Sequence, residues 1–259
     1  MARFWRQTLR RIPSWDACLA LVVPAGCAGM LAEAYTRTAI GDAEPAAACA
    51  FAPLALSAAN AETLTRRGLV VVDDVLSAGE LAAARRDAAT LARFSPAGDH
   101  GERGDSVCWV RGDDDDVGAG LRQAMRLLRG VPDALARRGY EASHHRVPRQ
   151  CQLARYTSRG KGYDRHLDRC SLGVEELGLL EWLRLSDYRG RALTAILYLN
   201  DDWQIQRDGG ALRCWIGGRE PFDVAPLGGR LVIFDSGAVE HAVLAASADR
   251  VALTVWINT

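Results

Sequence analysis

The second half of the chain is a series of short, β-branched segments, and this feature restricts the fold more than any other. The segments after Gln150 are CQLARYT, ALTAILYLN, ALRCWI, PFDVAP, RLVIFD, AVEHAVL and RVALTVWIN, several of them separated by glycine turns. Many short strands with turn residues between them are typical of a sandwich or barrel. Because helical segments precede the strands, we expect an α+β, mainly β chain: a double-stranded β-helix, or jelly roll, buttressed by N-terminal helices.

The segments before Gln150 carry helix signals. LSAANAETLTRRG predicts a helix that ends at Gly68, and Ser77 followed by Glu80 has the spacing of a capping box at the start of a second helix. LRQAMRLLRGVPDALARR predicts one further helix, and LVVVDDVL and SVCWV predict strands. Residues 113–116 are four consecutive aspartates, which we interpret as a solvated loop, because adjacent carboxylates cannot all reach one cation.

Composition excludes several classes of protein. The 259 residues are 49% hydrophobic and 25% charged, as in an ordinary globular enzyme, and 32 basic residues balance 32 acidic ones. A balanced charge with scattered arginines predicts no nucleic-acid partner. The seven cysteines are widely spaced, with no C-x-x-C pair, which favours reduced, buried thiols over a disulfide framework or a zinc site.

Residues 1–53 form an N-terminal extension in our reading, and residues 54–259 form one domain. The extension begins with MARFWRQTLRRIPSW, which has four arginines and no acid, and continues with the 16-residue apolar run ACLALVVPAGCAGMLA. This order is compatible with a targeting peptide, a docked helix or a poorly ordered tail. The apolar run is short and interrupted by Pro24 and Gly26, so we expect no membrane span.

The motif YDRHLD contains a candidate pair of metal ligands. A strand places residues two apart on one face, so His166 and Asp168 can point at the same ion. Such a pair is more often a surface hydrogen-bonding feature. His241, on a later predicted strand, changes the balance, since two histidines and one carboxylate form the facial triad of non-haem Fe(II) sites.

Arg250 begins the last predicted strand, in which it shares a face with Ala252, Thr254 and Trp256. An inward arginine is unfavourable unless it meets an anion, and a carboxylate bound by two hydrogen bonds is its natural partner. The alternative is a partly exposed salt bridge.

At this point the sequence resembles the prolyl-hydroxylase branch of the Fe(II)/2-oxoglutarate dioxygenases, and within it the EGL-nine type prolyl hydroxylases of hypoxia-inducible factor. The resemblance runs from about Leu54 to Trp256. It is carried by GLVVVDDVL, RGDSVCWVRG, ARYTSRGKGYDRHLD, GRALTAILYLNDDW, DGGALRCWIGG and DRVALTVW.

The resemblance implies a role for each site residue. His166, Asp168 and His241 would be the iron ligands. The residues implied for 2-oxoglutarate are Arg250, on its distal carboxylate, with Tyr198, Thr254 and Tyr156. Those implied for the target proline are Arg191, Trp256 and Trp109, with Tyr163 either closing the pocket or simply packing.

The implied activity is 4-hydroxylation of a proline in a protein or peptide, with Fe(II), 2-oxoglutarate, O2 and ascorbate as cofactors, succinate and CO2 as products, and a possible part in the hypoxia response as an oxygen sensor. The implied protein is monomeric and cytoplasmic or nuclear, or organellar if residues 1–53 are a targeting peptide. Two alternatives stay open: a dioxygenase of the same fold that acts on a non-proline or small-molecule substrate, and a non-catalytic binding module.

One departure from the family pattern lies beside the predicted metal site. The segment from Arg169 to Gly190, RCSLGVEELGLLEWLRLSDYRG, is longer than its counterpart in the family. It follows Asp168 directly, so we expect it near the mouth of the site, where EELGLLEWL either contacts a substrate or is a packed excursion. Which protein is the substrate, what the oxygen affinity is and whether residues 1–53 are cleaved cannot be read from the sequence.

Overall fold

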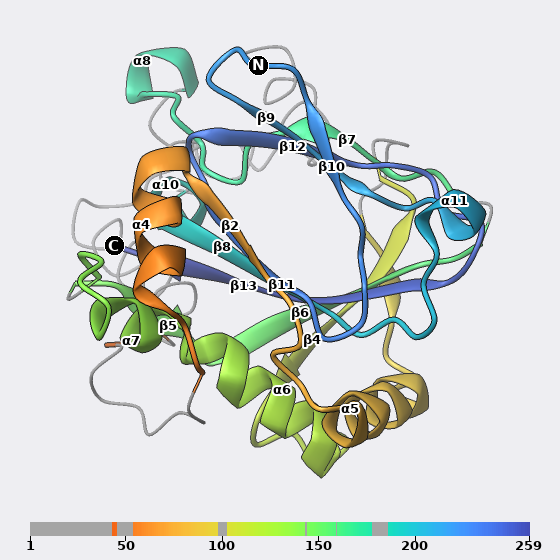
Figure 1. Cartoon of the computed structure of the whole chain (residues 1–259). Coiled ribbons are helices and arrows are strands. Elements are labelled where there is room, and N and C mark those ends of the chain that lie inside the picture. The colour runs from red at the N-terminus through yellow and green to blue at the C-terminus, as the bar shows by residue number, and fades with distance from the viewer. Residues whose placement is uncertain (1–42, 46–53, 98–102, 143, 159, 178–185) are drawn as a thin grey trace, which may run out of the picture.

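Two antiparallel sheets face each other in the computed structural model of this chain (Figure 1). The structure describes residues 43–45, 54–97, 103–142, 144–158, 160–177 and 186–259. The alternatives for the N-terminal extension therefore lie outside the described residues, apart from a short strand, β1 (Ala43–Pro45), that pairs with β5 (Arg146–Pro148). The proposed domain boundary at residue 54 stays a prediction.

The larger sheet has the strand order β2-β11-β8-β13-β6-β4-β3, with β5 joined to β13. Its remaining strands are β2 (Leu69–Val72), β3 (Ser95–Pro96), β4 (Asp105–Arg111), β6 (Gln150–Tyr156), β8 (Arg191–Tyr198), β11 (Leu231–Asp235) and β13 (Arg250–Asn258). The smaller sheet has the order β10-β9-β12-β7. Its strands are β7 (Tyr163–His166), β9 (Leu212–Ile216), β10 (Phe222–Val224) and β12 (Val239–Val243). Each strand predicted after Gln150 is present, and the two facing sheets confirm the double-stranded β-helix.

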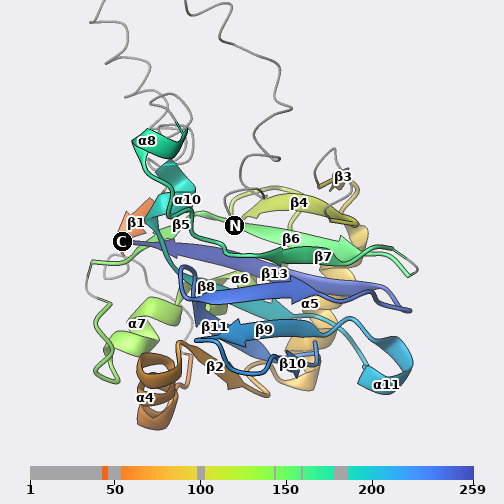
Figure 2. The same ribbon diagram turned by 90° about the horizontal axis from the view of Figure 1, so that it is seen from above.

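Helices cover the outer face of the larger sheet (Figures 1 and 2). They are α4 (Ala58–Arg67), α5 (Ala78–Thr90), α6 (Ala119–Arg129) and α7 (Val131–Ala136). The short helices α8 (Val174–Leu177), α10 (Ser186–Gly190) and α11 (Ile205–Asp208) lie in connections between strands. The predicted helix ends are confirmed: Gly68 caps α4 at φ 73°, and Ser77 and Glu80 form the capping box of α5.

The single helix predicted for residues 121–138 is wrong, because the structure has two helices there. Helix α6 ends at Arg129, Gly130 caps it, and α7 begins at Val131 with Pro132 in its first turn. Proline has no N–H to continue the hydrogen bonds of the preceding helix, and its ring clashes with the carbonyl four residues earlier. The same residue is well accommodated in the first turn of a new helix, where that N–H is not needed.

Two separate cores result from this arrangement. One lies between the helices and the outer face of the larger sheet and includes Leu121, Leu128 and Leu253. The other lies between the sheets and includes Tyr198 from β8 and Cys214 from β9. Alternation along each strand of the larger sheet sends side chains to the two cores in turn. The interior between the sheets is therefore lined by every second residue of β6, β8 and β13.

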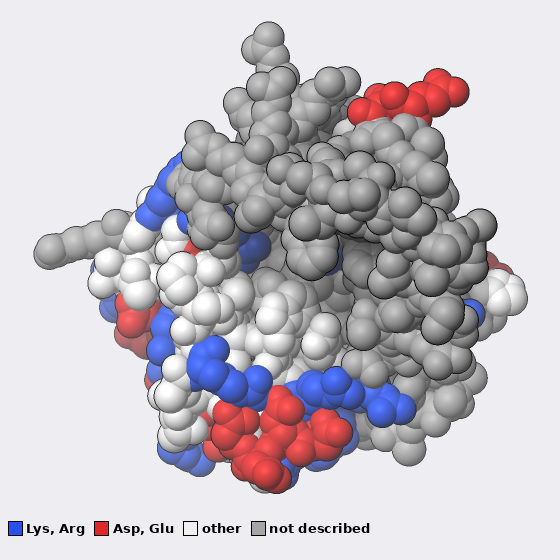
Figure 3. Space-filling view, turned by 180° about the vertical axis from the view of Figure 1, so that it is seen from behind, with Lys and Arg blue, Asp and Glu red and all other residues white. Residues whose placement is uncertain are grey.

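The surface and the thiols agree with the sequence. Acidic and basic side chains lie next to each other on the described surface (Figure 3), and Arg93 pairs with both Asp114 and Asp116, so that these carboxylates serve an ion pair in the exposed turn. The cysteines in the described part, at positions 108, 151, 170 and 214, are free and buried. No helix among the described residues is long and apolar enough to cross a membrane.

Candidate metal centre and buried arginine site

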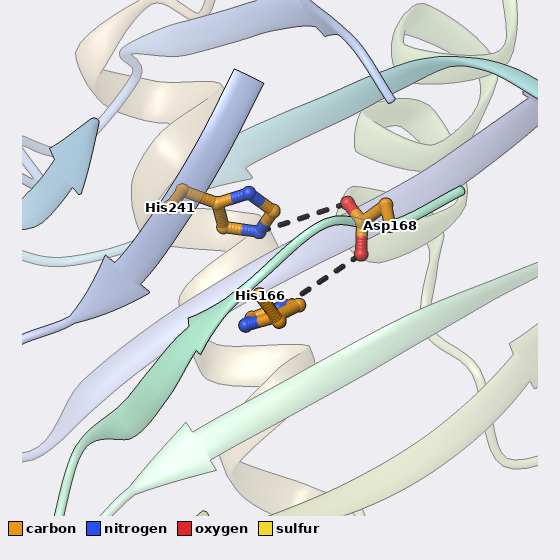
Figure 4. A group of neighbouring side chains, drawn as sticks. All are labelled: His166, Asp168 and His241. Carbon is orange, nitrogen blue, oxygen red and sulfur yellow. Dashed lines mark ion pairs between the residues drawn. The ribbon is translucent and has the colours of Figure 1, made fainter. Parts of the chain in front are cut away.

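His166, Asp168 and His241 come together in the interior between the two sheets (Figure 4). Strands β7 and β12 are neighbours, and His166 and His241 lie directly opposite each other in their pairing. One ligand atom from each of the three residues lies within 4.8 Å of the others, and all three side chains are buried. Within the part of the chain that the structure describes, this is the one cluster of three or more such side chains.

The strand geometry expected for His166 and Asp168 is wrong in detail. Strand β7 ends at His166, and Asp168 lies in the bend that follows it. The bend is held from both sides: Arg169 N donates to the carbonyl of Ser236 (2.8 Å), and Arg191 Nη1 donates to the carbonyl of Asp168 (3.4 Å). The carboxylate therefore reaches the histidines because the chain turns, and not because of alternation along a strand.

Both imidazoles are oriented by the backbone of their own strands. His166 Nδ1 is 2.7 Å from the carbonyl of Asp164, and His241 Nδ1 is 3.2 Å from the carbonyl of Val239. These contacts leave Nε2 of each ring facing the carboxylate, at 3.8 Å and 3.7 Å from Asp168 oxygens (Figure 4). A carbonyl on Nδ1 selects the tautomer whose Nε2 lone pair is available to a metal.

The carboxylate of Asp168 has its own support. Thr194 on β8 donates its hydroxyl to Asp168 Oδ2 at 2.7 Å and lies 2.9 Å from the hydroxyl of Ser236. Burial alone would raise the pKa of Asp168, but His241, His166 and Arg191 together hold this pKa below its usual range. A carboxylate with a fixed orientation and a full charge is a suitable ligand for a divalent metal.

The charge states match metal binding. Burial, followed by the neighbouring His241, lowers the pKa of His166 to about 3, so its imidazole is neutral at physiological pH. The site thus offers a neutral nitrogen donor from His166 and an ionised oxygen donor from Asp168. Two imidazoles and one carboxylate on one side of an ion leave further positions open, which is the ligand set of non-haem Fe(II) oxygenases. The residues present fit such an ion.

Arg250 is a buried cation deeper in the same interior. Its side chain is 2% exposed, Nε donates to the carbonyl of Gly210 at 2.9 Å, and Nη2 donates to the Tyr198 hydroxyl at 3.3 Å. Among the described residues, no carboxylate forms an ion pair with it. A buried guanidinium with neutral partners alone is unfavourable unless an anion binds there.

Gly210 is required for this arrangement. Its φ of 70° favours glycine, and a Cβ at this position would lie 3.2 Å from Arg250 Cδ and 3.1 Å from the Trp203 ring. The carbonyl that orients Arg250 can therefore approach only because the residue has no side chain.

Two tyrosines lie next to Arg250, and a buried threonine follows on the same strand face. Tyr156 lies opposite Arg250 in the pairing of β6 with β13, with its ring centroid 5.2 Å from the guanidinium carbon. Burial raises the pKa of both Tyr156 and Tyr198, so both phenols keep their protons and can donate hydrogen bonds. Thr254 is buried on the inner face of β13, four residues after Arg250 and between Ala252 and Trp256.

The residues predicted to line the proline site form a row at the other end of β13. The guanidinium of Arg191 lies over the rings of Trp256 (4.1 Å) and Tyr188 (4.0 Å), and Trp109 packs against Trp256 with ring centroids 5.9 Å apart. Tyr163 is elsewhere, stacked on the imidazole of His166 at 3.8 Å. The structure therefore places Tyr163 against the candidate metal centre and the other members at its edge.

Sequence reasoning missed several supporting residues. Thr194 and Ser236 orient Asp168, Gly210 orients Arg250, and Tyr188 covers one side of Arg191. A signal existed for Thr194, which lies four residues before Tyr198 and thus on the same face of the strand. No local pattern pointed to Ser236 or Tyr188, because their positions depend on how distant segments pack.

Comparison with known proteins agrees with this geometry. Residues 151–258 match the model of the 2OG-Fe(II) oxygenase superfamily. The chain is 30% identical to Egl nine homolog 1 of Rattus norvegicus over 158 residues, which are 60% of this chain and 41% of that protein. The chain thus spans about two fifths of the length of this relative.

Solved structures of prolyl hydroxylases have the same fold. A prolyl-4-hydroxylase from Pseudomonas putida is 28% identical with a TM-score of 0.60, covering 78% of this chain and 98% of that one. A prolyl hydroxylase from Trichoplax adhaerens, in complex with a peptide fragment of the hypoxia-inducible factor oxygen degradation domain, is 24% identical with a TM-score of 0.62, covering 77% and 87%. The matched segment contains the histidine and aspartate cluster and Arg250. Residues 151–258 are therefore similar, in sequence and in fold, to domains of the 2OG-Fe(II) oxygenase superfamily.

Proposed function

We propose that this protein is an Fe(II)- and 2-oxoglutarate-dependent prolyl 4-hydroxylase that uses O2 to hydroxylate a proline in a polypeptide and releases succinate and CO2. The observation that carries the proposal is the pairing of two sites in one interior. The cluster of His166, Asp168 and His241 fits a divalent iron, and the buried Arg250 requires an anion. A dicarboxylate such as 2-oxoglutarate can bind the iron at one end and supply the anion that Arg250 requires at the other.

Each side chain has a defined task in this proposal. His166 and His241 supply nitrogen ligands and Asp168 a charged oxygen ligand, while Thr194 holds the carboxylate in place. Arg250 holds the distal carboxylate of 2-oxoglutarate, with the protonated phenols of Tyr156 and Tyr198 close by, and Thr254 on the same face of β13 assists. When bound, the iron supplies the oxidative chemistry at its open positions.

The edge of the site supports a polypeptide substrate. Arg191, Trp256 and Trp109 form a cluster of aromatic rings and a guanidinium beside Asp168. Aromatic surfaces of this kind bind proline-containing segments, because the pyrrolidine ring packs on the ring faces. The prolyl hydroxylase relatives support the same assignment.

The proposal extends to the protein's partners and its place in the cell. We infer a monomer that takes a proline-containing protein or peptide as its substrate, in the cytoplasm or nucleus, with ascorbate keeping the iron reduced. A role as an oxygen sensor belongs to the same proposal. These points rest on the resemblance to the EGL-nine type enzymes.

The experiment that tests the proposal measures two products at once. Purified full-length protein is incubated with Fe(II), ascorbate and 2-oxoglutarate, with and without a library of proline-containing peptides, and succinate and the addition of one oxygen atom to the peptide are recorded. Peptide-dependent succinate with oxygen addition at proline supports the proposal. Succinate without peptide oxidation indicates a dioxygenase with another substrate, and no succinate indicates a binding module.

A matched control identifies the source of any activity. Asp168→Ala removes the charged ligand and is expected to abolish both products. The loss should exceed the roughly 10- to 100-fold effect of removing a partner that only orients a ligand. Retention of full turnover by this variant would contradict the assignment of the metal centre.

A further inference from the structure

We propose that Tyr188, contributed by the long excursion between Asp168 and Arg191, is a specificity-determining residue that contacts the substrate segment next to the reacting proline. The inference rests on the proposed function and deepens it. In this proposal Tyr188 recognises the residue next to the target proline in the substrate, and that residue is apolar or a second proline.

The ring of Tyr188 lies against the guanidinium of Arg191. The guanidinium carbon of Arg191 is 4.0 Å from the Tyr188 ring centroid and 4.1 Å from that of Trp256. The same guanidinium lies beside the candidate metal centre, 3.9 Å from Asp168 Oδ1. Tyr188 therefore extends the surface of Arg191 and Trp256 by one more ring, beginning a few ångströms from the ligand carboxylate.

The backbone at Tyr188 is hydrogen-bonded to the segment that follows Asp168. Cys170 N donates to the carbonyl of Tyr188 at 3.1 Å, and Cys170 is two residues beyond Asp168. At the end of α10, Thr259 N donates to the carbonyl of Gly190 at 2.9 Å, which places α10 beside the end of β13 (Figure 2). A ring held at both flanks can act as a binding surface with little loss of conformational entropy.

The rings of Tyr188 and Trp109 are exposed to solvent. Tyr188 is 38% exposed and Trp109 is 41% exposed, and these two rings are the outer members of the row that runs through Arg191 and Trp256. A row of exposed aromatic faces beside a buried site indicates a binding surface more than a packing requirement.

These observations define the chemistry of the substrate neighbour. The Tyr188 ring, stacked on the guanidinium that also contacts an indole, offers a surface that is apolar over the ring and polar at its edge. Such a surface suits an extended segment whose residue beside the target is a second proline or an apolar side chain. A charged or glycine neighbour would make no apolar contact with the Tyr188 ring.

The test uses full-length enzyme with Fe(II), ascorbate and 2-oxoglutarate, and a synthetic library in which one proline is flanked by varied residues. The variants are Tyr188→Ala and Tyr188→Phe. Phe222→Ala is the matched control, because Phe222 is also 41% exposed but lies on β10 of the smaller sheet. For peptides with an apolar or proline neighbour, Tyr188→Ala should raise the peptide KM about 3- to 10-fold, the size expected for loss of one aromatic contact.

Further readouts separate recognition from a structural role. The KM for 2-oxoglutarate and the Tm should stay near the wild-type values in Tyr188→Ala, and Tyr188→Phe should restore the peptide KM because it keeps the ring. With glycine as the neighbour, wild type and Tyr188→Ala should have equal peptide KM values. Phe222→Ala should behave as the wild type throughout.

Specific results would overturn the inference. An unchanged peptide KM in Tyr188→Ala, or the same rise for glycine and apolar neighbours, removes Tyr188 from substrate recognition while the hydroxylase proposal stands. Equal rises in the KM values for peptide and 2-oxoglutarate would assign Tyr188 a purely structural role. If wild-type enzyme hydroxylates no member of the library, the proposed function fails, and this inference fails with it.

Discussion

The two faces of β13 differ in what they contact, although they alternate along one strand. Leu253, Val255 and Ile257 point to the helices and are almost fully buried in an apolar core. Arg250, Ala252, Thr254 and Trp256, which alternate with them, point into the space between the sheets. The outer face resembles any protein core, whereas the inner face carries a buried cation and an indole Nε1 that is buried without a hydrogen-bond partner among the described residues.

The difference shows how the strand combines stability with function. Burial of apolar side chains on the outer face contributes about 1.5–3 kcal/mol for each large residue. A buried guanidinium without an anion contributes nothing comparable and opposes folding. We therefore expect substitutions on the outer face to lower stability and leave the site intact, and substitutions on the inner face to do the reverse.

The largest effect on stability should come from the outer face. Leu253→Ala removes a side chain with no exposed surface and should lower the free energy of unfolding by about 2–5 kcal/mol, because the cavity cannot close fully. Urea unfolding followed by circular dichroism measures this change. The KM for 2-oxoglutarate of the folded variant should equal that of the wild type, and a large shift would mean that the two faces are coupled.

Arg250→Met should have the opposite effect. Loss of a charge-assisted contact worth about 1.5–3 kcal/mol should raise the KM for 2-oxoglutarate roughly 10- to 150-fold. The free energy of unfolding should stay the same or rise, since a buried charge is replaced by an apolar side chain. Arg250→Lys keeps the charge but loses the planar fork, so it should fall between the two. Lower stability together with unchanged 2-oxoglutarate binding would contradict the assigned role.

The third prediction concerns Thr194 on the inner face of β8. Thr194→Val keeps the shape but removes the hydroxyl that donates to Asp168. The affinity for Fe(II) should fall about 10- to 100-fold, as is usual for partners that orient a ligand. Isothermal titration with Mn²⁺ as a redox-stable substitute measures this change, and an unaltered affinity would show that Arg191 and the bend alone hold the carboxylate.

The smallest effect should come from the helix layer. Ser77→Ala removes the side-chain cap of α5, and the free energy of unfolding should fall by about 1 kcal/mol. Turnover and both KM values should be unchanged, since α5 lies on the outer side of the larger sheet. Urea unfolding and a standard succinate assay on the same preparation check both parts.

Much of the fold could be predicted because its signals are local. The capping box at Ser77, the end of α4 at Gly68 and the alternation of RVALTVWIN depend on backbone geometry within a few residues. The break between α6 and α7 also has a local signal, Gly130 and Pro132. The apolar pattern continues through this break, and for that reason the periodicity predicts a single helix.

The sequence by itself determined which chemical groups the chain carries and on which face of a strand each one lies. It therefore named His166, His241 and Arg250 as candidates. The tertiary structure decided how those groups meet: the bend that aims Asp168, the glycine carbonyl on Arg250, the hydroxyl of Thr194, and the excursion that returns Tyr188 to the edge of the site. These contacts join segments that are distant along the chain, and no local pattern specifies which distant segment will pack against which. Those contacts form only when the two sheets pack face to face.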